Sequence, residues 1–224
     1  MKTKLFLIGI ALFFVSAPLQ AQLLPGNFWL NPTFEAGTGT SPTGTPDNWN
    51  RGGADGSILH WSTANSLSPV HALAVIKPVA GPFGEWYSDV SIAGLAGFGD
   101  MVTMRWNEMY NLSGGEMRLT VRFLDSFGSG PDNHFVVTGN SAGWGGTVGS
   151  SVFSVRNQQL LVNQPGAVTM RIQLVSGGGD STIGSYLLDD LSVAVVPEPS
   201  TIALLSAGGL VGLRGWLRRR KIAR

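Results

Sequence analysis

The sequence has 224 residues, no cysteine and a net charge of +1. The absence of cysteine excludes disulfides, zinc–thiolate sites and a thiol nucleophile. Basic residues are concentrated at the two ends, so residues 22–196 have 7 basic and 13 acidic side chains, a net charge of about −6. This balance argues against nucleic acid as a partner, because nucleic-acid binding depends on Lys and Arg contacts to phosphates.

Residues 1–21 have the pattern of a secretory signal peptide. Lys2 and Lys4 precede an apolar run from Leu5 to Val15, and the small residue Ala21 ends the segment. The run has about eleven residues, whereas a membrane-spanning helix needs roughly 20. We therefore expect a cleavable signal peptide, with an N-terminal membrane anchor as the alternative.

The middle of the chain alternates short apolar runs with segments rich in Gly, Ser, Thr and Asn. In residues 117–125 and 168–174 the apolar side chains occupy every second position. This period of two indicates strands with one buried and one solvent-facing side. We expect strands at 57–63, 71–77, 85–92, 101–110, 117–125, 134–139, 152–157, 167–175 and 186–196.

Short strands separated by Gly-rich turns predict an all-β fold, and we expect one antiparallel β-sandwich domain over residues 22–196. Residues 37–48 are expected to be a loop within that domain.

Two motifs in this region resemble a known family. The opening stretch, LLPGNFWLNPTFEAG followed by TPDNWNRGG, and the last expected strand, YLLDDLSV, are similar to jelly-roll carbohydrate-binding modules of the galactose-binding-like type. The resemblance implies a jelly-roll sandwich. It also implies a structural calcium ion between Glu35 and Asp189 or Asp190, and carboxylate oxygens are ligands that calcium prefers. The alternative is that one aspartate faces solvent and the other caps a neighbouring loop.

Aromatic side chains are the candidates for contact with sugars, because their rings can stack on a pyranose face. Trp144 lies in a Gly-rich loop and is the tryptophan most expected to be exposed, followed by the pair Trp86 and Tyr87. Trp49 is expected in the core. Covering the end of the sandwich is the alternative role for Trp144.

No catalytic constellation stands out. GNSAG at residues 139–143 matches the G-x-S-x-G pattern, but the Gly-rich sequence after it cannot form the helix that a nucleophile elbow requires. Glycoside hydrolysis needs two carboxylates across a cleft, and no pattern singles out such a pair. We therefore expect no enzymatic activity, and a small secreted hydrolase is the least favoured alternative.

The C-terminal residues 197–224 have three parts. A Pro-Glu-Pro triplet comes first, an uncharged apolar run at 199–213 follows, and a basic cluster ends the chain. With residues up to 217 added, the run spans about 26–28 Å as a helix, just enough for a bilayer core. The positive-inside rule would keep the basic cluster in the cytoplasm. The triplet is Pro197, Glu198 and Pro199, and the basic cluster is Arg218, Arg219, Arg220 and Lys221.

This order of parts resembles the PEP-CTERM sorting signal. The resemblance implies processing by an exosortase in a Gram-negative bacterium that produces exopolysaccharide. We expect a precursor anchored in the inner membrane by a single transmembrane helix, and then a protein of the cell surface or extracellular matrix. Its predicted role is noncatalytic, with polysaccharide as the candidate ligand. The alternative is a purely structural surface or biofilm protein without a specific ligand.

Overall fold

The computed structural model describes residues 23–54, 58–64, 66–67, 70–138, 153–176 and 183–196. Over these ranges the regular elements are β-strands, and none of the described residues form a helix with the length and apolarity to cross a membrane. The predicted signal peptide, the loop that holds Trp144 and the C-terminal tail lie outside these ranges.

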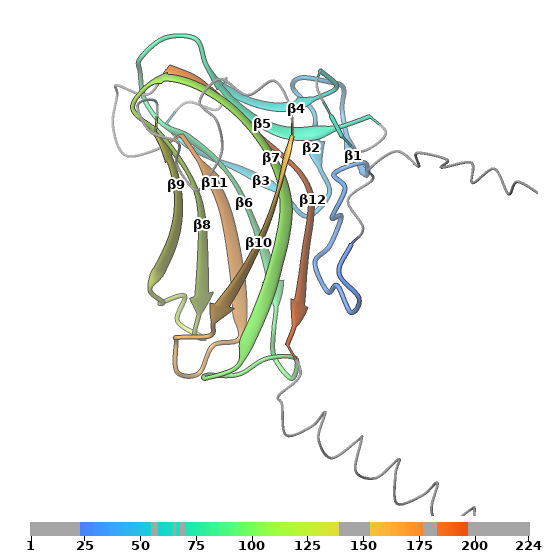
Figure 1. The fold of residues 1–224 in the computed structure, drawn as a ribbon, viewed down its shortest axis with the longest axis vertical. Coiled ribbons are helices and arrows are strands. Elements are labelled where there is room, and N and C mark those ends of the chain that lie inside the picture. Colours follow the sequence, from blue (N-terminus) through green and yellow to red (C-terminus); the bar gives the residue numbers. More distant parts are fainter. Residues whose placement is uncertain are drawn as a thin grey trace, which may run out of the picture.

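Two five-stranded antiparallel sheets form the layers of a sandwich (Figure 1). The first sheet has the order β3 (Asn50–Gly53), β6 (Gly84–Ser91), β11 (Thr169–Val175), β8 (Glu116–Leu124) and β9 (Asp132–Thr138). The second sheet has the order β10 (Ser154–Leu161), β7 (Met101–Gly114), β12 (Ile183–Val195), β5 (Ala72–Lys77) and β4 (Leu59–Ser62). The all-β antiparallel architecture expected from the sequence is confirmed.

Three strands were not expected from the sequence. The short strands β1 (Gly37–Thr38) and β2 (Thr45–Pro46) pair with each other inside the segment predicted to be a loop, and β3 follows directly. These segments are Gly- and Pro-rich and lack apolar alternation, so their strand conformation depends on the neighbouring chain rather than on their own pattern.

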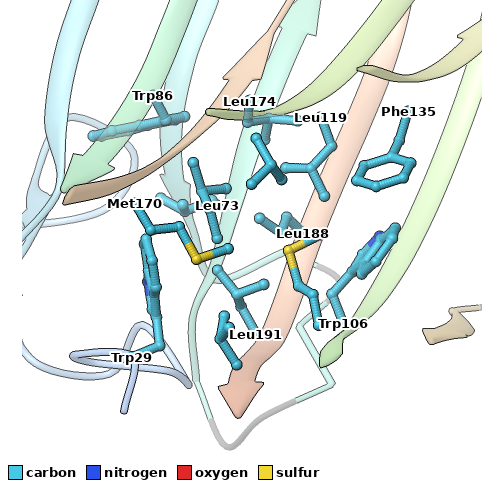
Figure 2. Close-up of a cluster of buried hydrophobic side chains, with 14 of the residues drawn as sticks. Trp29, Leu73, Trp86, Trp106, Leu119, Phe135, Met170, Leu174, Leu188 and Leu191 are labelled. Carbon is cyan, nitrogen blue, oxygen red and sulfur yellow. The ribbon is translucent and has the colours of Figure 1, made fainter. Parts of the chain in front are cut away.

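The core lies between the two sheets (Figure 2) and follows the predicted alternation. The alternating apolar residues of β8 and β11 are completely buried: Met117, Leu119, Val121, Phe123, Met170, Ile172 and Leu174. Burial of a side chain of this size contributes about 1.5–3 kcal/mol. A register slip of one residue would expose the whole set, so this face fixes the strand register.

Strand β12 contains a β-bulge. Its register against β7 shifts between Asp189 and Ser192, where two residues lie opposite one, and Asp190 adopts a φ of 48°. The extra residue reverses the alternation, so that Leu188 before it and Leu191 after it both reach the core. The bulge therefore lets an apolar strand carry two adjacent aspartates.

Candidate functional site

The outer side of the first sheet is polar. Because side chains alternate along a strand, the residues between the buried positions of β6, β11, β8 and β9 project away from the core. We call this surface the polar face, and its residues on these strands are Glu85, Tyr87, Asp89, Glu116, Arg118, Thr120, Arg122, Asp132, His134, Arg171 and Gln173. Asn50 of β3, which lies opposite Tyr87, adds to it.

Tyr87 lies within a set of paired side chains on this face. Arg171 donates two hydrogen bonds to Asp89, each 2.7 Å long, and its guanidinium carbon lies 5.2 Å from the centre of the Tyr87 ring. The hydrogen bond to Asp89 raises the pKa of Arg171. Next to this pair, the Gln173 amide donates to Glu85 over 2.9 Å. The aromatic ring is thus supported by a guanidinium that is itself held by two hydrogen bonds.

The pairing continues across the sheet onto β8 and β9. Arg122 forms an ion pair with Asp132 at 2.7 Å, and the Thr120 hydroxyl lies 3.0 Å from Nδ1 of His134. The strand register aligns Tyr87 with Gln173, Gln173 with Thr120, and Thr120 with His134. A row that begins at an aromatic ring therefore crosses four strands and offers an amide and an imidazole group, with the buried Thr120 hydroxyl between them.

The structure corrects the prediction for Trp86. This side chain is completely buried, its indole N–H donates to the Ala74 carbonyl at 3.0 Å, and the Arg51 guanidinium lies 4.7 Å from its ring. Trp86 occupies an inward position of β6, whereas Tyr87 next to it points outward. The other tryptophans of the described ranges are buried too: Trp29, Trp49, Trp61 and Trp106.

Glu35 joins the opening motif to the start of β5. Its Oε1 accepts the backbone N–H of Val70 at 3.0 Å and of His71 at 2.9 Å, and its Oε2 lies 3.1 Å from Nδ1 of His71. The His71 ring stacks on Trp61 with a centroid distance of 4.1 Å. The carboxylate predicted to bind calcium is thus engaged by N–H groups of one loop.

Asp189 is engaged in the same way. It is completely buried, and its two oxygens accept the backbone N–H groups of Leu67 at 2.6 Å and Asp190 at 2.8 Å. The Asn107 amide donates to Asp190 at 3.2 Å, while the buried Oδ1 of Asn107 has no hydrogen-bond partner among the described residues.

These contacts bear on the predicted calcium site. The described residues contain no group of three or more acidic, histidine or cysteine side chains that could hold a metal. Asp190 and Asn107 provide the oxygens that suit a cation, because one is a carboxylate and the other is an orphaned buried carbonyl. Glu35 and Asp189 instead hold the loop that contains Leu67 and His71. Calcium binding stays a prediction.

A buried polar network that was not predicted lies between the sheets. Glu108 accepts hydrogen bonds from Arg156 at 2.7 Å, from the Trp106 indole at 3.0 Å, and from the Tyr186 hydroxyl. Burial, followed by the Glu108 charge, raises the pKa of Tyr186 well above its usual value. The sequence did contain a signal for this network, since Glu108 occupies an inward position in the alternation of β7 between Trp106 and Tyr110.

Comparison with known proteins identifies both parts of the chain. Residues 195–221 match the model of the PEP-CTERM protein-sorting motif. No curated protein matches the chain. Among solved structures, TmCBM61 in complex with β-1,4-galactotriose has a TM-score of 0.51 and 16% identity, covering 77% of this chain and 100% of that one.

Two further structures are similar at lower scores. The CBM22-1 xylan-binding domain from Paenibacillus barcinonensis Xyn10C has a TM-score of 0.41 and 13% identity, covering 73% of this chain and 91% of that one. The enzymatically active domain of bacteriophage CBA120 tailspike protein 4 has a TM-score of 0.48 and 15% identity, covering 67% of this chain but 20% of that one.

The all-β sandwich is thus similar in fold to TmCBM61. The C-terminal segment is a PEP-CTERM sorting motif. The resemblance of the C-terminal residues to the sorting signal is confirmed, and the β-sandwich fold implied by the other resemblance is confirmed too.

Proposed function

We propose that this chain is an exported, exosortase-processed, noncatalytic protein of the cell surface or extracellular matrix that binds polysaccharide through the polar face. The observation that carries the proposal is the half-buried Tyr87 ring, supported by Arg171 and flanked by paired amide and carboxylate groups. Such a surface combines an aromatic ring with fixed donors and acceptors, which is the combination that a polyhydroxylated ligand needs.

The ion pairs of the polar face favour binding over a purely structural role. Arg171 and Arg122 are each held by an aspartate across a strand boundary, so little side-chain freedom remains to be lost when a ligand binds. The row from Tyr87 to His134 also runs across the strands, which suits an extended chain better than a single sugar.

Affinity electrophoresis of the full chain tests this proposal, with soluble polysaccharides embedded in native gels. We expect retardation by at least one neutral polysaccharide, and a Tyr87→Ala variant should bind about tenfold more weakly, which corresponds to roughly 1.4 kcal/mol. Gln159→Ala is the matched control, because Gln159 is exposed on β10 of the other sheet. Absence of retardation by any polysaccharide would favour the purely structural alternative.

Trp144 remains a second proposed contact on the loop between β9 and β10. The same gels test it, since Trp144→Ala should weaken retardation if the loop reaches the ligand. An unchanged mobility would restrict the site to the sheet.

The sorting motif supports the processing part of the proposal. Prolines at 197 and 199 disfavour a helix across the triplet, so we expect this sequence to suit a processing enzyme that binds an extended backbone. We expect the mature exported protein to lack the residues after about position 199, as measured by intact mass. A mature protein that retains the cluster Arg218 to Lys221 would contradict exosortase processing.

A further inference from the structure

Three loops and the end of β12 meet at one end of the sandwich. Residues 92–100 join β6 to β7, residues 125–131 join β8 to β9, and residues 162–168 join β10 to β11. The register places the start of β7 beside the end of β12, and the backbone N–H of Val196 donates to the Met101 carbonyl at 2.9 Å. The chain therefore leaves the sandwich at this end (Figure 1).

Large apolar side chains are exposed at the same end. We call these four residues the apolar tips, and their relative exposures are Leu95 50%, Phe98 63%, Phe127 89% and Leu161 49%. The two most exposed of them are the phenylalanines, each in a loop. Exposed apolar residues that gather at one place on a small domain indicate an interaction surface.

Hydrogen bonds within the loops fix the positions of the apolar tips. Asp125 accepts the backbone N–H groups of Phe127 and Ser129, both at 2.9 Å, and the Gln164 amide at 3.0 Å. Asp100 accepts the N–H of Gly97 at 2.7 Å. The loops are therefore built to display these side chains, and little order has to be gained when they meet a partner.

The charge at this end of the sandwich limits the kind of partner that can bind there. The three loops contain no lysine, arginine or histidine. Their two acidic residues, Asp100 and Asp125, turn their carboxylates to N–H groups of the loops themselves. A largely apolar surface without basic side chains has no electrostatic complement for an anionic polymer, but it suits the apolar–polar boundary of a neutral lipid layer.

The length of the connecting chain places this end close to the membrane. The sorting motif starts at residue 195, and the apolar run starts at residue 199. The three residues from Val196 to Pro199 span at most about 10 Å when extended. As long as the run lies in the bilayer, the apolar tips cannot be far from the lipid headgroups.

We propose that, before processing, the sandwich rests on the outer surface of the membrane through the apolar tips, with the phenylalanines inserted among the lipids. This inference rests on the proposed membrane hold of the C-terminal run. The contact orients the domain with its triplet at the membrane boundary, where a membrane-embedded processing enzyme acts. Removal of the tail takes away the membrane-spanning run. The apolar tips alone are then too few to keep the domain on the membrane, so the mature protein is released.

A fluorescent probe next to Phe127 tests this contact in the full chain. The natural sequence has no cysteine, so Ser126→Cys can be labelled with an environment-sensitive fluorophore at a single site. Ala80→Cys gives the matched probe at the opposite end of the sandwich, in the loop after β5. Both chains are reconstituted into phosphatidylcholine vesicles, with and without spin-labelled lipid.

We expect the probe at position 126 to have a blue-shifted emission and at least twofold stronger quenching by spin-labelled lipid than the probe at position 80. Combining Phe98→Ser with Phe127→Ser should remove the difference, whereas Val79→Ser at the opposite end should not. Equal quenching at both positions, or a shift that depends on protein concentration rather than on lipid, would overturn the contact. Failure of the chain to float with the vesicles would overturn the anchoring of the C-terminal run in the membrane. Flotation of a chain whose position 126 is exposed to solvent would instead overturn only the contact between the apolar tips and the lipids.

Discussion

Glu108 and Asp89 are both carboxylates paired with an arginine, but they lie in opposite regions of the molecule. Glu108 is buried between the sheets with Arg156, Trp106 and Tyr186, whereas Asp89 is exposed on the polar face with Arg171. In the interior pair the carboxylate is buried and the guanidinium of its partner is only slightly exposed. The surface pair can exchange its partners for solvent or for the hydroxyls of a ligand. The location of a charged pair therefore determines whether it serves stability or recognition.

The largest expected effect comes from removal of the interior carboxylate. Glu108→Ala should lower the free energy of unfolding by about 3–5 kcal/mol, because it leaves a buried guanidinium without its carboxylate partner. Asp89→Ala should lower it by less than about 1 kcal/mol, since that pair is exposed. Urea unfolding of the two variants measures both values. Similar losses in both would contradict the contrast between the regions.

Asp189 extends the comparison to a third carboxylate, which is completely buried and accepts two backbone N–H groups. Asp189→Ala should lower the free energy of unfolding by about 2 kcal/mol, because the N–H groups of Leu67 and Asp190 lose their acceptor. Urea unfolding again gives the value, with Asp132→Ala on the polar face as the control. A loss no larger than that of the control would show that the hydrogen bond from the Leu67 N–H to Asp189 contributes little to stability.

Calcium binding would widen the difference between the buried and the exposed carboxylates, because the cation would bind near Asp189 and Asp190 and not near Asp89. We expect chelation to lower the melting temperature of the full chain by several degrees, at about 2–4 °C per kcal/mol for a chain of this size. Asp190→Asn should reduce this sensitivity to chelation, whereas Asp89→Asn should not. The same melting temperature in chelator and in calcium would contradict calcium binding by these side chains.

The smallest expected effect concerns Asp125. This residue lies in a surface loop, but its carboxylate accepts three hydrogen bonds, as a buried carboxylate would. Hydrogen bonds from the backbone N–H of Ser129, and then from Phe127 and Gln164, lower the pKa of Asp125. A lowered pKa in the folded state means that the contribution to stability is present above the pKa of the unfolded chain and is lost as the pH falls through the folded value. Asp125→Asn should therefore reduce the loss of stability below about pH 4, as measured by urea unfolding across pH. An unchanged pH profile would contradict this role.

The sequence predicted the sheets better than the chemistry of individual carboxylates. The alternation in β8 and β11 identified the buried side chains correctly, because burial on one face leaves a period of two. The same reasoning applied to residues 85–92 places Trp86 inside and Tyr87 outside. The prediction of Trp86 as a sugar contact was therefore wrong, because it did not use this alternation.

The partners of Glu35 and Asp189 were beyond the sequence. Apart from the neighbouring Asp190, their N–H donors are Leu67, Val70 and His71, which lie 35 or more positions away along the chain. The β-bulge at Asp190 was equally hidden, because the pattern of β12 does not reveal which residue is left out of the pairing. Such contacts depend on which distant segments of the chain pack together, and a local sequence pattern does not predict this.

The position of β12 has a consequence for the order of assembly. This last strand of the sandwich lies in the middle of the second sheet, with β5 on one side and β7 on the other. In the proposed export of the chain, the two halves of that sheet cannot join until residues 183–195 have crossed the membrane, and the sorting motif, which starts at residue 195, follows directly. Completion of the fold and arrival of the sorting motif at the membrane therefore coincide in time. A processing enzyme that acts after this moment receives a finished domain, and a chain that stalls earlier presents an open sheet instead.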